Sequence, residues 1–316
     1  MLRSMSSAVA GLKAHQTAMD VIGNNIANVN TYGFKASKTM FRDVMYQTLA
    51  AGTAGVAGST GGTNPSQVGY GSTASAVEVN TGRAGMTTTG NDQDCYIDGE
   101  GYFVVANGAL DSVTGVPGSG YLYTRVGDEL TFDNHGYLTD GAGNYICGIN
   151  NGGGASADLT ASPTDVSLKN PDSSDRGIAA IRYDPANNMG SKGTGSKVTL
   201  TSAAVGSDGT ITAQDSSGNV VTVGRIALAY FANPAGLTEE GNSMYSSVSG
   251  NAGTATYSVP GSGSVGKIVT GALESSGTDL ANEFTNMIQY ERGFQANTKL
   301  VTVSDEMLQT LVNMKQ

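Results

Sequence analysis

Both ends of the chain carry apolar side chains at seven-residue intervals, which predicts helices that each bury one narrow stripe. In the N-terminal segment the pattern predicts a helix over residues 2–29. A second stripe begins at Leu2 and Val9, but polar residues and glycine then interrupt it. The first stripe consists of Met5, Leu12, Met19 and Ile26.

The C-terminal pattern is stronger and predicts a helix over residues 279–314. Asp279 or Thr278 is a suitable N-cap, since either follows the helix-breaking "SSG". Phe284 and Val312 lie on a second stripe that charged and polar residues interrupt. The first stripe consists of Leu280, Met287, Phe294, Val301 and Leu308.

Two interpretations of these helices are open. They are either two core helices of one globular domain or helices that associate between subunits. They lie at the extreme ends of a chain whose middle is almost wholly β in pattern, and a thin stripe stabilises a lone helix pair poorly. We therefore expect the stripe residues, with Val9 and Phe284, to form a subunit interface that becomes ordered against other copies.

The segments between the helices alternate short apolar runs such as "CYIDGEGYFVV" and "IALAYFA" with turn signals. Asp98-Gly99 and Asp140-Gly141 are candidate hairpin turns. The predicted fold is mainly β with terminal α-helices, which pair as a coiled-coil-like layer around nested β domains. The expected division is a helical domain of 1–30 plus 279–316, an extended linker or loop region of 31–75, a β domain of 76–149 plus 223–278, and a small inserted β domain of 150–222.

Composition supports a β-rich scaffold and narrows the partners. Gly accounts for 45 of 316 residues, while charged residues make up only 14%. A net charge of −10 without a basic cluster argues against nucleic acid as a partner. The N-terminus lacks the apolar core of a cleaved signal peptide, and the longest apolar run, seven residues, is too short for membrane insertion.

The sequence contains no motif typical of catalytic residues, a metal site or a cofactor site, so we do not expect an enzyme. His15 and His135 are interpreted as ordinary solvated side chains. Cys95 and Cys147 either pair or stay reduced on strands, and the reduced state is preferred because two cysteines are too few to staple a secreted chain of this size.

Several segments resemble the bacterial flagellar rod and hook proteins. The N-terminal "SSAVAGLKAHQTAMDVIGNNIANVNTYGFKASKTMF" is similar to the family's N-terminal signature, and "LESSGTDLANEFTNMIQYERGFQANTKLVTVSDEMLQTLVN" is similar to its C-terminal segment. The inner segments "GGTNPSQVGYG", "IDGEGYFVV" and "RIALAYFANPAGL" also resemble family segments. Within the family the chain looks most like hook proteins, partly because of the inserted stretch, and a distal rod protein is the near alternative.

The resemblance implies a hook subunit that self-assembles into a curved hollow tube, joins rod to filament and transmits torque for motility. It implies export without cleavage through the flagellar type III apparatus to an extracellular place in the hook or basal body. The implied partners are other copies, rod proteins, the hook cap and the hook–filament junction proteins. An extracellular β-rich binding module is a less favoured class, since no aromatic or charged cluster stands out on the β loops.

The segment "NNIANVNTYGF" is expected to form the junction between inner helix and outer β domains. Two interpretations of its asparagines are open: amides that exchange hydrogen bonds between neighbours and water as layers slide, or residues that cap a helix end and favour left-handed turns. One departure from the family is Gly277, which would loosen the return to the last helix. The expected junction residues are Asn24, Asn25, Asn28, Asn30, Tyr32, Gly33 and Phe34.

Overall fold

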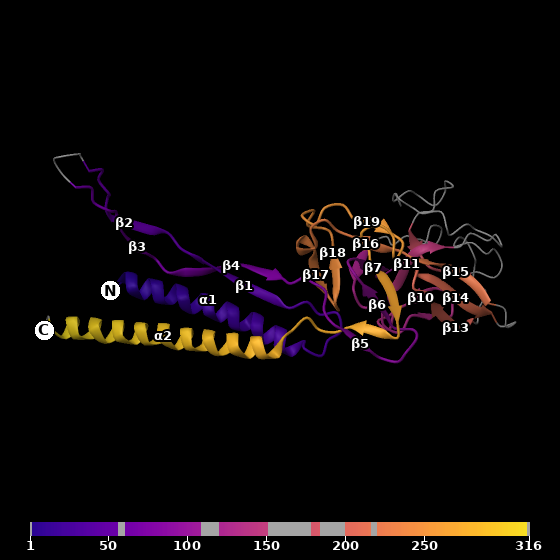
Figure 1. Ribbon diagram of the computed structural model, residues 1–316. Coiled ribbons are helices and arrows are strands. Elements are labelled where there is room, and N and C mark those ends of the chain that lie inside the picture. The colour runs from indigo at the N-terminus through magenta and orange to yellow at the C-terminus, as the bar shows by residue number, and fades with distance from the viewer. Residues whose placement is uncertain are drawn as a thin grey trace. The chain divides into compact units, whose positions relative to one another are not determined.

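The computed structural model describes residues 2–55, 61–108, 120–150, 178–183, 200–215 and 220–314 (Figure 1). These residues form two compact units. Unit 1 consists of 1–29, 35–80 and 278–316, and unit 2 consists of 30–34 and 81–277. The chain ends therefore share one unit.

Unit 1 contains the two predicted helices, α1 (Leu2–Ala27) and α2 (Leu280–Asn313). They lie side by side and antiparallel, with the two chain ends at the same end of the pair (Figure 1). Asp279 caps α2 as predicted, because its carboxylate accepts hydrogen bonds from the backbone N–H groups of Ala281 and Asn282. Within the described residues, neither helix is long and apolar enough to cross a membrane.

The remainder of unit 1 is a pair of two-stranded ribbons, which occupy most of the segment expected to be extended or loop-like, 31–75, and continue to Val79. Gly71, with φ +104°, follows β3, and a Cβ there would lie 2.9 Å from the carbonyl oxygen of Ser7. A glycine is needed at this position because the ribbon approaches the backbone of α1 so closely. The antiparallel pairs are β1 (Ser37–Asp43) with β4 (Ser72–Val79) and β2 (Tyr46–Ala50) with β3 (Ser66–Gly69).

Unit 2 is built on a 13-stranded sheet whose main path runs β13-β14-β15-β11-β7-β8-β18-β17, with two further two-stranded pairs, β6 with β20 and β5 with β21. The elements are β5 (Met86–Thr88), β6 (Cys95–Asp98), β7 (Tyr102–Ala106), β8 (Leu122–Thr124), β9 (Thr131–Phe132), β10 (Leu138–Thr139), β11 (Tyr145–Asn150), β12 (Ala179–Ala180), β13 (Leu200–Val205), β14 (Thr210–Asp215), β15 (Val220–Ile226), β16 (Leu228–Tyr230), the 3₁₀ turn η1 (Pro234–Gly236), β17 (Thr238–Gly241), β18 (Met244–Ser246), β19 (Thr256–Ser258), β20 (Lys267–Thr270) and β21 (Ala272–Glu274).

The central strand β7 contributes to the hydrophobic core on both faces of this sheet. All five of its residues are buried. Phe103 and Val105 belong to one hydrophobic cluster, whereas Tyr102, Val104 and Ala106 belong to another. Successive side chains of a strand point to opposite faces, so β7 is covered on both sides, and its unbroken apolar run in the sequence reflects that burial.

The expected inserted domain, 150–222, is described only in part. Strands β13 and β14 come from this range; β13 pairs with β14 and β14 with β15, in the same sheet as β11 and β7. The stretches 151–177, 184–199 and 216–219 lie outside the described residues. A separate small domain in this range stays a prediction.

One of the two predicted hairpin turns is wrong. Asp140-Gly141 does connect a hairpin, since Thr139 of β10 pairs with Tyr145 of β11. Asp98-Gly99 connects β6 to β7, but β6 pairs with β20 instead. The "DGEG" glycines instead present their carbonyl oxygens to the guanidinium of Arg125.

Both cysteines are free and buried, in agreement with the preferred reduced state. Cys95 lies on β6 and Cys147 on β11. Burial, assisted by the neighbouring Asp94 carboxylate, raises the pKa of the Cys95 thiol to about 12, and burial also raises that of Cys147. Neither thiol is therefore a ready nucleophile at neutral pH.

Asp128 is half-buried beside other carboxyl groups, and this crowding gives a testable stability effect. Burial raises its pKa, and the charges of Asp140, Asp94 and Glu129 act in the same direction. The protonated form is favoured in the folded state, so that stabilisation is present at low pH and is lost as pH rises through the folded pKa. Asp128→Asn should therefore raise the free energy of unfolding at pH 7 by roughly 0.5 kcal/mol, a small value because solvent screens the site. Urea titrations at pH 7 and pH 3.5 test this, and a gain that persists undiminished at the lower pH would contradict it.

Candidate subunit interface and chain junction

The helix pair of unit 1 packs through small residues, which bring the two backbones close together. A Cβ on Gly11 of α1 would lie 2.6 Å from Nδ2 of Asn297, and one on Gly293 of α2 would lie 2.7 Å from Nε2 of His15. Only glycine allows both contacts. Helix α1 packs against both α2 and the ribbon strands, and its buried residues are Ala8, Gly11, Ala14, Ala18, Ile22 and Asn25.

The α1 residues expected at a subunit interface are not fully buried within the chain. Met5, Leu12, Met19 and Ile26 are half-buried, and Val9 is exposed. As subunit-interface residues, these five stay a prediction.

On α2 the predicted stripe divides into two groups. Met287, Phe294, Val301 and Leu308 are half-buried, whereas Leu280 and Phe284 are exposed. Ser304, at the same face as Val301 and Leu308, is buried. Further large side chains of α2 and of its C-cap residue are exposed to solvent, namely Ile288, Leu300, Val303, Met307, Leu311, Val312 and Met314.

His15 is not the solvated side chain expected from sequence. Its ring lies 5.8 Å from that of Phe41 on β1 and 5.9 Å from that of Tyr290 on α2, and those two rings are 5.6 Å apart. The cluster ties together three elements of unit 1. His135, in contrast, is exposed in the turn between β9 and β10, as predicted.

Asn25 is the central residue of the junction on the unit 1 side, and it is fully buried. Its Nδ2 donates hydrogen bonds to the carbonyl oxygen of Ser37 (2.8 Å) and to Oε1 of Glu283 (3.1 Å), while its Oδ1 accepts one from the Ser37 N–H (3.0 Å). The Thr278 hydroxyl donates to the Asn25 carbonyl oxygen (3.2 Å). One side chain thus connects α1, β1 and the first turn of α2.

The other asparagines have local roles. Asn28 donates from Nδ2 to the carbonyl oxygen of Asn24 (2.9 Å) and to its Oδ1 (3.0 Å), which finishes the last turn of α1. Asn24 and Asn30 are exposed. The helix-end interpretation therefore fits Asn24 and Asn28. The interpretation of exchanging amides is wrong for Asn25, because a buried amide with three side-chain hydrogen bonds does not exchange them with water.

Asn25→Ala should destabilise unit 1 by about 2–4 kcal/mol, since it leaves the buried N–H and C=O groups of Ser37 without partners. Asn28→Ala is the matched control and should cost under about 1 kcal/mol, because its bonds are local and exposed. Urea denaturation followed by helix signal in circular dichroism measures both. Equal, small effects of the two substitutions would contradict the role assigned to Asn25.

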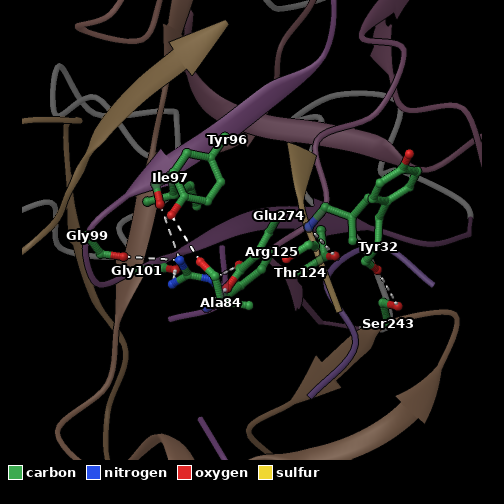
Figure 2. Close-up of polar contacts among 12 residues, drawn as sticks. Tyr32, Ala84, Tyr96, Ile97, Gly99, Gly101, Thr124, Arg125, Ser243 and Glu274 are labelled. Carbon is green, nitrogen blue, oxygen red and sulfur yellow. Dashed lines mark hydrogen bonds and ion pairs between the residues drawn. The ribbon is translucent and has the colours of Figure 1, made fainter. Parts of the chain in front are cut away.

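Tyr32, Gly33 and Phe34 form the junction on the unit 2 side. The Gly33 N–H donates to the carbonyl oxygen of Glu274 (2.8 Å), and at φ +68° a Cβ on Gly33 would lie 2.4 Å from Cγ2 of Val126. The carbonyl oxygen of Tyr32 accepts a hydrogen bond from the Ser243 hydroxyl (3.4 Å; Figure 2). The Gly277 N–H donates to the carbonyl oxygen of Phe34 (2.9 Å), so the glycine expected to loosen this return is held in place.

Beside Gly33, a buried ion pair joins Arg125, which follows β8, to Glu274, which ends β21 (Figure 2). Arg125 Nε lies 2.5 Å from Glu274 Oε2, and the side chains are 2% and 0% exposed. The second carboxylate oxygen, Oε1, accepts a hydrogen bond from the Ala84 N–H (2.8 Å). Both charges are thus compensated inside the unit, as buried charges must be.

The "DGEG" segment completes the site of Arg125. The carbonyl oxygens of Gly99 and Gly101 accept hydrogen bonds from the guanidinium at 3.1 and 2.9 Å, and that of Ile97 accepts one at 3.3 Å. Gly99 and Gly101 have φ of +139° and +124°, which only glycine adopts readily. The guanidinium also lies 5.8 Å from the ring centroid of Tyr102. Burial raises the pKa of Tyr102 to about 12, although the positive charge of Arg125 acts in the opposite direction.

Sequence reasoning missed this ion pair because neither residue lies in a recognisable motif. Arg125 stands between apolar and turn residues in "YTRVGD", and Glu274 is 149 positions away. The one available signal was their chemistry: each is a charged residue within a run that otherwise alternates as a buried strand. The described contacts of the junction are structural, since they orient backbone groups and compensate charges.

Two segments of the chain match families of known proteins. Residues 5–35 match the family described as "Flagella basal body rod protein". Residues 269–314 match "Flagellar basal body rod FlgEFG protein C-terminal". The two segments contain most of α1 and all of α2, together with the junction residues.

Proteins that match this chain over its whole length are likewise named flagellar rod or hook proteins. The chain is 38% identical over 318 residues to the flagellar basal-body rod protein FlgG of Bacillus subtilis, with 100% of both chains covered. It is 26% identical over 453 residues to the flagellar hook protein FlgE of Borreliella burgdorferi, again with 100% of both covered. It is also 26% identical over 318 residues to the flagellar basal-body rod protein FlgG of the same organism, with the same full coverage.

Proposed function

The chain belongs to the family of flagellar rod and hook proteins, which are structural proteins and not enzymes, and from this premise we propose that it is the subunit of the flagellar hook. In this role it self-assembles into a curved hollow tube that joins rod to filament and transmits torque. It is exported uncleaved through the type III apparatus and meets rod, cap and hook–filament junction proteins at the ends of the tube.

The main support for self-assembly is the exposed apolar surface on the helices of unit 1. The contact with α1 leaves large side chains of α2 such as Phe284, Met307 and Leu311 exposed. Burying such a side chain contributes about 1.5–3 kcal/mol. In a lone chain these side chains stay in contact with water, whereas a neighbouring copy could bury them.

Charge placed on the half-buried stripe of α2 tests the assembly role. Phe294→Glu and Val301→Glu should each abolish assembly and leave the β-rich unit 2 folded, because a carboxylate cannot be buried unpaired at low cost. Thr298→Glu, at an exposed position of the same helix, is the control. The readouts are the yield of sheared axial structures and the circular dichroism of tyrosines. Normal yield from either stripe variant would mean that the stripe is not an interface.

A distal rod subunit is the second candidate function. The hook assignment rests on "GGTNPSQVGYG", "ALAYFANPAGL" and the inserted stretch 150–222, whereas the 38% identity to a protein named as a rod protein favours the rod. Electron microscopy of a strain lacking the gene separates the two. Rods without hooks support the hook, and absence of the distal rod supports the alternative.

A further inference from the structure

Two open surfaces of unit 1 complement each other. The first, the α1 groove, is a hollow of about 560 Å³ between α1 and the ribbon strands, lined by apolar Met5, Val9, Ala10 and Val44 and by the positive charge of Lys13. The second, the α2 stripe, consists of Val303, Met307 and Leu311 with the negative charge of Glu306, and it borders an open hollow of about 500 Å³. Among the described residues, neither Lys13 nor Glu306 makes an ion pair within its own chain.

The α2 stripe cannot fill the α1 groove of the same chain. Gly11 lies against Asn297 and Gly293 against His15, so the antiparallel register places Val9 level with about residue 299. Met307 is then roughly 12 Å further along the axis. The same register brings the start of α1 roughly level with Glu306, so the last turns of α2 extend beyond α1.

The dimensions and direction of the two surfaces fit a neighbouring copy. Val303 to Leu311 and Met5 to Lys13 both span about 12 Å of helix. Copies in a tube share one direction, so a neighbour's α2 runs antiparallel to this α1, as the chain's own α2 does. That direction sets Leu311 beside Met5, Met307 beside Val9 and Val303 beside Lys13, with Glu306 within one turn of Lys13.

Resting on the proposed function, we infer that the α2 stripe of one copy occupies the α1 groove of the next, with Lys13 and Glu306 paired across the contact. The two surfaces are different, so the contact is head-to-tail and propagates through successive copies instead of closing as a dimer. The ligand of the groove is thus a second copy of this chain, and charge complementarity selects its direction.

Disulfide trapping tests this pairing in full-length chains. Co-expressed Val9→Cys and Met307→Cys variants should form intermolecular cross-links in isolated axial structures, since the pairing brings these positions within disulfide reach. Cross-links within one chain are excluded by the 12 Å offset, and the native cysteines are buried. Gln309→Cys replaces Met307→Cys in the control, because it is exposed and lies about 200° around the helix from position 307.

The outcomes separate the pairing from the proposed function. Cross-linking with Met307→Cys but not with Gln309→Cys supports the pairing. Normal structures with no Met307 cross-link overturn it while leaving the proposed function intact, and absence of the chain from axial structures overturns the function itself. Charge reversal adds a second measurement: Lys13→Glu and Glu306→Lys should each lower assembly about fivefold, and the double variant should restore it. A double variant no better than its parents would overturn the pairing.

Discussion

Glu274→Ala is expected to destabilise unit 2 by about 3–5 kcal/mol, because it leaves the Arg125 guanidinium buried without its counter-charge. It also removes the acceptor of the Ala84 N–H. Near-UV circular dichroism during urea denaturation is the appropriate measurement, since tyrosines on β7, β8, β18 and β19 pack around this part of the unit.

Asp98→Ala provides the matched control. It removes the ion pair between Arg83 and Asp98, whose side chains are both about half exposed, and should cost under about 1 kcal/mol. A second variant, Arg125→Met with Glu274→Leu, removes both buried charges together and should recover much of the lost stability. If Glu274→Ala lowered the free energy of unfolding no more than Asp98→Ala, the buried ion pair would not be important for the stability of unit 2.

Gly293→Val is expected to separate α1 from α2 and to stop assembly. Its Cβ would lie 2.7 Å from Nε2 of His15, so that ring would have to shift from its contacts with Phe41 and Tyr290. Overpacking of this kind costs about 1–3 kcal/mol, and β-branching in a helix adds a few tenths. Helix signal in circular dichroism and the yield of assembled structures measure the effect, while unit 2 should stay folded.

A second helical glycine supplies the control for that experiment. A Cβ on Gly23 of α1 meets nothing within 4 Å. Gly23→Ala should therefore stabilise the helix by about 0.5–1 kcal/mol. Comparable losses from both substitutions would show that helix propensity, and not the Gly293–His15 contact, controls the pair.

The elements were largely predictable from the sequence, whereas the contacts between them were not. The heptads of large residues identified both helices, and Asp279 identified where the second one begins. The heptads did not reveal the contacts at Gly11 and Gly293, because glycine carries no periodic apolar signal and yet allows a close approach.

At the junction, too, the position was predictable from the sequence and the contacts were not. Its position in "NNIANVNTYGF" was predictable, but the different roles of its asparagines depend on partners far along the chain, such as Glu283 for Asn25. The Arg125–Glu274 pair likewise joins residues 149 positions apart. A pair of residues so far apart in the sequence leaves no local pattern, so the pairing is seen only in the folded structure.

Hydrogen exchange tests the central claim, that the helices at the chain ends are stabilised by other copies of the chain. Amides of residues 280–314 would be compared between a dilute monomer and the assembled tube, with β7 as an internal reference. The account predicts that helix amides become protected at least about a hundredfold on assembly, from burial of one or two exposed apolar side chains per turn, while β7 does not change. Equal protection of the helix in monomer and tube would contradict it.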